Sequence, residues 1–146
     1  MSLLLAMAAL TAIGAIAPPL LIRRSRDRLA ARILARAGPK PSLLTPADLC
    51  TGRFRRVPGV LGLGGDAIVF ESRHERPLSL PLSRIRRISS GSRMTTTGRR
   101  LLRAEVLTLA DSEGNVAEFL MPKASVYQWR QHLGAWAARE KKSKEP

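Results

Sequence analysis

The segment from Ser89 to Arg100 carries residue types that could bind a phosphate group. Serine and threonine hydroxyls donate hydrogen bonds, and the planar arginine guanidinium offers paired donors that match phosphate oxygens. Two glycines in the same segment would let the backbone approach a ligand. The candidate anion- or lipid-binding residues are Arg86, Arg87, Ser90, Ser92, Arg93, Thr95, Thr96, Arg99, Arg100 and Arg103. The alternative interpretation is a flexible hairpin loop with a solvated cluster of charges.

Other residues that could do chemistry lack the partners that chemistry needs. His74 lies in a charged turn and His132 on a polar helix face, and no carboxylate pair or third ligand can be assigned to either. The glycines from Gly59 to Gly65 do not follow the Gly-x-Gly-x-x-Gly spacing and no helix follows them. Cys50 is the only cysteine, so there is no internal disulfide. We expect a protein that is not an enzyme and has no cofactor and no metal.

The charge of the chain favours a polyanionic partner. The net charge is +14, and 20 of the 25 basic residues are arginine. Such a balance suits nucleic acid or the anionic face of a membrane, although arginine can also serve simply as a surface cation. The six aromatic residues are few for a protein that stacks on single-stranded bases. Nucleic acid is therefore the less favoured partner.

The first residues of the chain predict a membrane anchor. Residues 2–22 contain no ionisable side chain, and Arg23 and Arg24 follow directly. A helix of 21 residues is roughly 30 Å long, which matches the hydrocarbon core of a bilayer. Basic residues beside a span favour the cytoplasmic side. We expect a single-pass protein of the cell membrane, with its N-terminus outside and its C-terminal domain in the cytoplasm.

A cleaved signal peptide is the main alternative to this anchor. No basic side chain precedes the apolar stretch, and the best cleavage triplet, residues 15–17, is followed directly by Pro18. Both features favour an anchor that is retained. Pro18 and Pro19 should kink or end the helix, which would leave a short span.

Residues 23–37 have the pattern of an amphipathic helix beside the membrane. Leu29, Ile33 and Leu34 form an apolar stripe, and arginines recur every four residues from Arg24. We expect this helix to lie in the membrane interface, with a solvated stalk as the alternative. The expected membrane-surface residues are Arg23, Arg24, Arg28, Arg32 and Arg36.

The rest of the chain predicts a linker, a small β domain and a tail, at residues 38–48, 49–140 and 141–146. Short β-like runs alternate with turn residues such as Pro58-Gly59. A bulge near Val106 is expected, because the apolar face switches there. Val126, Trp129 and Leu133 then share one face of a C-terminal helix. The expected strands are Gly52–Val57, Val60–Gly64, Ala67–Ser72, Leu78–Leu82, Ile85–Ser90, Leu101–Ala110 and Val116–Met121.

The run from Arg55 to Ala138 resembles the pleckstrin-homology (PH) superfold, and most closely the GRAM and bacterial PH-like domains. The resemblance rests on the segments Gly59–Ser72 and Leu80–Ile88, on Phe119, and on Trp129 with Leu133. It implies a mainly β fold: a seven-stranded, partly open barrel capped by a C-terminal helix. It also implies a scaffold that binds lipids or protein segments and performs no reaction. The short Pro58-Gly59 turn departs from the long basic loop of phosphoinositide readers.

Together these patterns predict a membrane-anchored PH- or GRAM-like binding module. It would engage anionic phospholipid headgroups or an acidic protein segment at the cytoplasmic face. The alternative is a structural subunit of a membrane protein complex with no lipid specificity, in which a barrel edge or the terminal helix contacts a protein partner.

Overall fold

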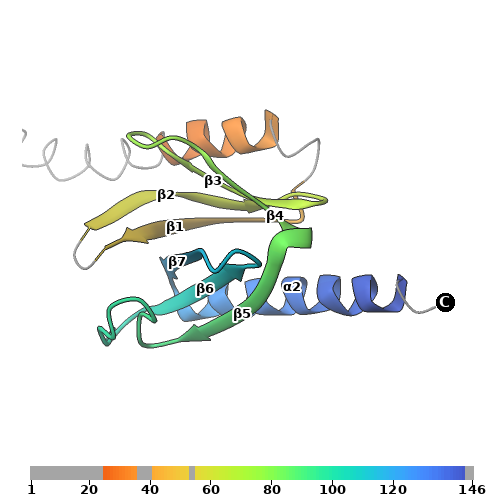
Figure 1. Ribbon diagram of the computed structural model, residues 1–146. Helices are drawn as coiled ribbons and strands as arrows, with labels where there is room; N and C mark the ends of the chain where they lie inside the picture. Colours follow the sequence, from red (N-terminus) through yellow and green to blue (C-terminus); the bar gives the residue numbers. More distant parts are fainter. Residues whose placement is uncertain (1–24, 36–40, 53–54, 144–146) are drawn as a thin grey trace, which may run out of the picture.

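The computed structural model describes residues 25–35, 41–52 and 55–143 of the chain. It is mainly β, with seven strands and a C-terminal helix, α2 (Lys123–Ser143), and residues 25–35 form a further helix (Figure 1). The predicted span, residues 2–22, lies outside the described residues. Within the part that is described, none of the helices combines the length and the apolar character that crossing a bilayer requires. The strands are β1 (Leu43–Thr51), β2 (Arg55–Leu63), β3 (Ala67–Ser72), β4 (Leu78–Pro81), β5 (Ile85–Gly91), β6 (Glu105–Asp111) and β7 (Val116–Met121).

The strands form one antiparallel sheet in the order β4-β3-β2-β1-β7-β6-β5. β4 and β5 are therefore its two edges, although they are neighbours in sequence, joined by the single 3-10 turn Leu82–Arg84. The sheet folds over on itself into two layers, β1–β4 and β5–β7, and α2 lies along the second layer (Figure 1). This is the expected mainly β domain with a C-terminal helix.

The main core fills the space between the two layers and α2. Alternate residues of the strands point into it, as the period of two requires. Phe70 and Phe119 pack with their rings 5.6 Å apart, and Trp129 of α2 is fully buried among them. The indole Nε1 of Trp129 donates a hydrogen bond of 3.0 Å to Thr45 Oγ1, which satisfies the one polar atom of the ring. Trp129 thus plugs the core, as its position on the apolar stripe predicted.

The N-terminal helix (residues 25–35) covers the outer face of the first layer. Its Leu29 and Ile33 are buried against Val60 of β2 and Val69 of β3 in a second apolar cluster. Gly62 permits this close approach, because a Cβ atom there would lie only 2.5 Å from Ile33 Cγ2. The expected interfacial helix would have turned Leu29 and Ile33 toward lipid. In the structure the sheet takes that place, and the exposed side chains are those of the opposite face.

The structure corrects two boundaries at the start of the β domain. Most of the expected linker is strand: residues 43–48 form the first part of β1. Pro58-Gly59, expected as a turn, lies inside β2, with Gly59 paired to Ala47. Proline is tolerated in a strand where one neighbouring strand is missing. β3 pairs with β2 only from Gly59 onward, so Pro58 lies at such a place. The two expected strands on either side of Pro58 are one.

The bulge expected near Val106 is also misplaced. β6 begins at Glu105, so Leu101 and Ala104 precede the strand and pack on the outer face beside Val106. Leu107 and Leu109 point into the main core. The irregular register lies instead in β5, between Ile85 and Arg87.

Candidate anion-binding site

The segment joining β5 to β6 forms an irregular hairpin, residues 92–104, that is fixed to the outer face of the second layer. It projects at the lower left of Figure 1, while the N-terminal helix lies above the sheet. Met94 is buried against Val106 and Leu120, and Leu101 packs beside them. Backbone pairing closes the hairpin, with Arg93 bridged to Arg100 and a hydrogen bond of 2.6 Å from Leu101 N to Ser92 O. The segment is therefore held in one shape on the sheet.

A concave polar surface of about 450 Å³ lies between this hairpin and strands β5 and β6. Five of the ten predicted anion-binding residues line it, and Ser89, Gly91 and Thr108 complete it. Its hydroxyls and two guanidinium groups are the donors that a phosphate would need. The five predicted residues are Ser90, Ser92, Arg93, Thr95 and Arg100.

The arginines of this surface are not neutralised by carboxylates. Among the described residues, the ion pairs join Arg55 to Glu75 and Arg84 to Glu113, and neither Arg93 nor Arg100 takes part. Residues 85–104 contain six arginines and no acidic residue. Both arginines of the surface are exposed, so the site can attract an anion from solution.

Glu118 of β7 is a buried acidic residue that orders the hairpin. It is 1% exposed, and its carboxylate accepts hydrogen bonds from the backbone N–H groups of Thr95 and Thr96 and from Thr96 Oγ1. Hydrogen bonds to a carboxylate are stronger than those between neutral groups. Thr96 is thereby committed to an internal partner and is not available to a ligand. Sequence reasoning missed Glu118 because it lies more than 20 positions from the threonines that it holds.

Four other predicted residues are exposed but do not line this surface. Arg86 and Arg87 lie on β5, and Arg99 and Arg103 lie on the hairpin. Arg130 of α2, which the sequence did not single out, reaches Ser90 Oγ at 3.4 Å. Sequence spacing could not predict this contact, because Arg130 and Ser90 are 40 positions apart.

Two of the five predicted membrane-surface arginines lie among the described residues. Arg28 and Arg32 lie on the exposed face of the N-terminal helix, as does Arg26. Arg23, Arg24 and Arg36 lie outside the described residues. On the β1–β2 side, Arg55 is paired with Glu75 across to the turn after β3, so it is partly committed within the protein.

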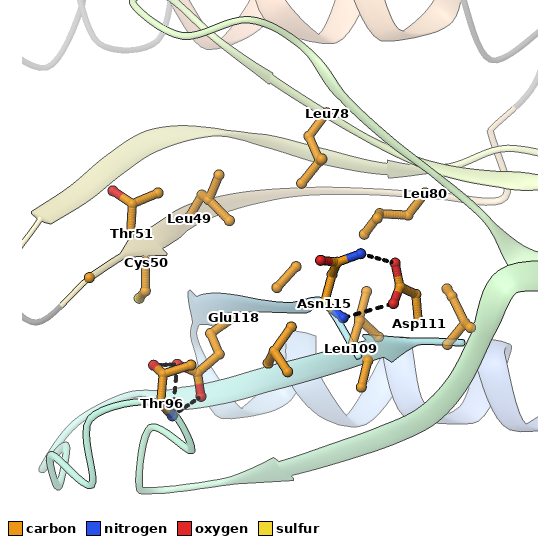
Figure 2. A pocket seen from close by; sticks show the side chains of 15 residues that line it. Leu49, Cys50, Thr51, Leu78, Leu80, Thr96, Leu109, Asp111, Asn115 and Glu118 are labelled. Atoms are coloured by element: carbon orange, nitrogen blue, oxygen red, sulfur yellow. Dashed lines mark hydrogen bonds between the residues drawn. The ribbon is translucent and has the colours of Figure 1, made fainter. Parts of the chain in front are cut away.

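A second cavity, of about 460 Å³, opens between the two layers where β4 and β5 fail to pair. Figure 2 shows Leu49, Leu78 and Leu80 on one side of it and Leu109 on the other. Thr96 and Glu118 lie at one end of the cavity, and none of its lining residues also lines the polar surface. No sequence pattern predicted this cavity, because it arises where the two edge strands of the sheet diverge.

Two titratable groups at this cavity have displaced pKa values. The side-chain amide of Asn115 donates to Asp111 at 2.8 Å and, together with backbone N–H groups, lowers the pKa of Asp111. Burial raises the pKa of the Cys50 thiol, and the Arg56 charge offsets part of that rise. Cys50 is therefore a weakly acidic thiol that packs beside the hairpin cluster, and not an activated nucleophile.

Comparison with known proteins gives a fold and no family. Neither protein families nor curated protein sequences match the chain. Among solved structures, it is similar to the crystal structure of the C-terminal domain of an unknown protein from Leishmania infantum. The similarity has a TM-score of 0.55 at 11% sequence identity and covers 80% of this chain and 95% of that one. The seven-stranded antiparallel sheet with its C-terminal helix is consistent with a PH-like barrel.

Proposed function

We propose that this chain is a non-catalytic, GRAM-like binding module that engages anionic phospholipid headgroups at a membrane surface. The observation that carries the proposal is the concave polar surface between the hairpin and strands β5 and β6. It gathers Arg93, Arg100 and five hydroxyl side chains on a hairpin that packs on the sheet, with no carboxylate paired to either arginine among the described residues.

The charge around the site supports a membrane surface as the source of the phosphate. Arg86 and Arg87 on β5 and Arg99 and Arg103 on the hairpin are exposed on the elements that form the concave surface. Each basic residue near an anionic leaflet contributes about 1 kcal/mol of attraction. A broad cationic surround with a central set of donors suits a headgroup set among other headgroups.

The apolar residues 2–22 support an anchored form of this module. We propose that they span the cell membrane with the N-terminus outside and hold the β domain at the cytoplasmic face, as the adjacent arginines favour. Anchoring would raise the effective concentration of headgroups at the site, so weak contacts would suffice.

The proposal is tested with the full chain and vesicles of phosphatidylcholine, with and without phosphatidylglycerol. Sedimentation measures binding across a series of salt concentrations, and hydrogen exchange measures protection of residues 89–104. Binding to phosphatidylcholine vesicles alone is the baseline, and it includes any binding that comes from the apolar residues 2–22. We expect phosphatidylglycerol to increase binding and to protect the hairpin, and salt to reverse both changes.

Two matched double variants locate the site. Arg93→Gln/Arg100→Gln removes two charges from the concave surface, and Arg73→Gln/Arg76→Gln removes two from the exposed turn after β3. The first pair should weaken the phosphatidylglycerol-dependent binding roughly thirtyfold, as two contacts of about 1 kcal/mol each imply. An equal loss in the second pair would show diffuse attraction without a site. No gain from phosphatidylglycerol in the unmodified chain would remove the lipid proposal.

The apolar cavity favours a second candidate, a structural subunit that binds a protein partner. Its leucine lining and its position between two unpaired edges would suit an apolar side chain of another protein. A partner that co-purifies in fixed proportion, and that Arg93→Gln/Arg100→Gln does not release, would support this candidate over the first.

A further inference from the structure

Leu102 is the most exposed large apolar side chain in the part of the chain that the structure describes. It is 91% exposed, whereas Tyr127, the next, is 64% exposed. Its neighbour Leu101 is packed on the sheet with Met94 and Val106. Successive residues of the hairpin thus point in opposite senses, one into the protein and one into solvent.

The hairpin has no freedom to bury Leu102 by local collapse. Met94 and Leu101 fix its two arms to the outer face of β6 and β7. Glu118 holds Thr95 and Thr96, and the Arg93–Arg100 bridge closes the base. A leucine on a mobile loop could fold back onto the protein surface. Because this segment is held on both sides, Leu102 stays in water unless another molecule or a membrane covers it.

The residues beside Leu102 indicate which environment would bury its side chain. Arg99, Arg100 and Arg103 are exposed on both sides of it. Arginine keeps its charged end at the level of phosphates while its stem follows apolar surface, so leucine between arginines suits the boundary between headgroups and acyl chains. A stable protein interface would instead need a broader apolar core with few charges.

We infer that Leu102 inserts into the acyl-chain boundary of an anionic bilayer while Arg99, Arg100 and Arg103 remain at the headgroups. The inference rests on the proposed function, because the concave surface next to Arg100 would take a headgroup at the same time. It adds a depth and an orientation: the stretch between the Arg93–Arg100 bridge and the start of β6 enters the membrane.

Spin labels on the full chain measure that depth. In a Cys50→Ala background, one label is placed by Leu102→Cys and a control label by Tyr127→Cys on α2. Accessibility to oxygen rises in the apolar phase, and accessibility to a soluble nickel chelate falls. We expect both changes at position 102 with phosphatidylglycerol vesicles only, and neither at position 127. A label at position 102 that stays in water while the chain shows phosphatidylglycerol-dependent binding would overturn the insertion and leave the headgroup site standing.

Binding by unlabelled variants gives an independent measure. Leu102→Ser should weaken phosphatidylglycerol-dependent binding roughly tenfold, because it removes most of the apolar surface available for insertion. Leu102→Trp should bind at least as well as the unmodified chain, and Tyr127→Ser should not change binding. The buried Trp129 signal confirms folding in each case. Loss with Arg93→Gln/Arg100→Gln but not with Leu102→Ser would mean that headgroups bind without insertion; loss with neither would end the lipid proposal itself.

Discussion

The N-terminal helix and the β5–β6 hairpin both combine arginines with aliphatic residues, but they expose different side chains. The sequence predicted that the helix lies in a membrane interface and that the hairpin binds an anion or lipid headgroup. In the helix, Leu29 and Ile33 are buried on β2 and β3 and the arginines are left in solvent. In the hairpin, Leu102 is left in solvent between the arginines. The difference shows that amphipathic composition identifies an apolar face but not what covers it.

The largest effect should come from the buried side of the helix. Ile33→Ala should lower the free energy of unfolding by about 2–5 kcal/mol, because a fully buried isoleucine leaves a cavity. Urea unfolding of the full chain measures this change. Leu34→Ala, at a position that is 43% exposed, should cost below about 1 kcal/mol. Equal costs at the two positions would mean that the helix is not docked on the sheet.

Gly62 offers a second test of the same contact from the side of the sheet. Gly62→Ala places a Cβ atom 2.5 Å from Ile33 Cγ2, so the helix must move. We expect a loss of about 1–3 kcal/mol in unfolding free energy, as for an overpacked core. Gly65→Ala is the control, because a Cβ atom there meets no atom within 4 Å. A neutral Gly62→Ala would contradict the close approach of the helix.

The strands were predictable because each apolar alternation is local to its own sequence. Seven strands were expected and seven are present, but the number agrees only because one strand was missed and another was predicted as two. β1 was missed because Pro46 and Pro41 lie in or beside it, and β2 was divided at Pro58. Proline is excluded only where a neighbouring strand would accept a hydrogen bond from the N–H that it lacks, and the sequence does not show which neighbours a strand will have.

The candidate site was predictable only in part, for a related reason. The hydroxyls and arginines of the hairpin are close in sequence, so their types alone suggested a phosphate site. Glu118 of β7, which holds the hairpin, and Arg130 of α2, which reaches Ser90 of β5, are brought to the site only by the fold. Contacts between residues so far apart in sequence produce no local pattern from which they could be predicted.

The arginines of the helix should matter less for lipid binding than those of the hairpin. The helix lies on the outer face of the first layer and the hairpin on the outer face of the second, so the exposed helix arginines and the hairpin arginines belong to different surfaces of the domain (Figure 1). Arg28→Gln/Arg32→Gln should therefore reduce phosphatidylglycerol-dependent sedimentation less than about fivefold, against roughly thirtyfold for the hairpin pair. A larger loss in the helix pair would restore the interfacial helix expected from the sequence.

A smaller effect should follow from weakening the support of the hairpin. Glu118→Gln keeps the shape of the side chain but replaces charge-assisted hydrogen bonds with neutral ones, at a cost of about 1 kcal/mol. Hydrogen exchange at Thr95 and Thr96 should accelerate roughly fivefold, while exchange in β2 is unchanged. Uniform acceleration across the sheet would show that Glu118 supports the whole fold and not the hairpin in particular.

The smallest effect concerns Cys50, which packs under the hairpin that exposes Leu102. Burial raises the pKa of its thiol, so at alkaline pH the unfolded chain releases the proton before the folded chain does. The folded state then holds more protons than the unfolded state, and stability must fall as pH rises from the unfolded pKa toward the folded one. Cys50→Ser removes this dependence, so the two unfolding free energies should differ in slope only on the alkaline side. Equal slopes would mean that the Cys50 thiol is not buried against Met94, Val106 and Leu120, and would contradict the packing of the hairpin on the sheet.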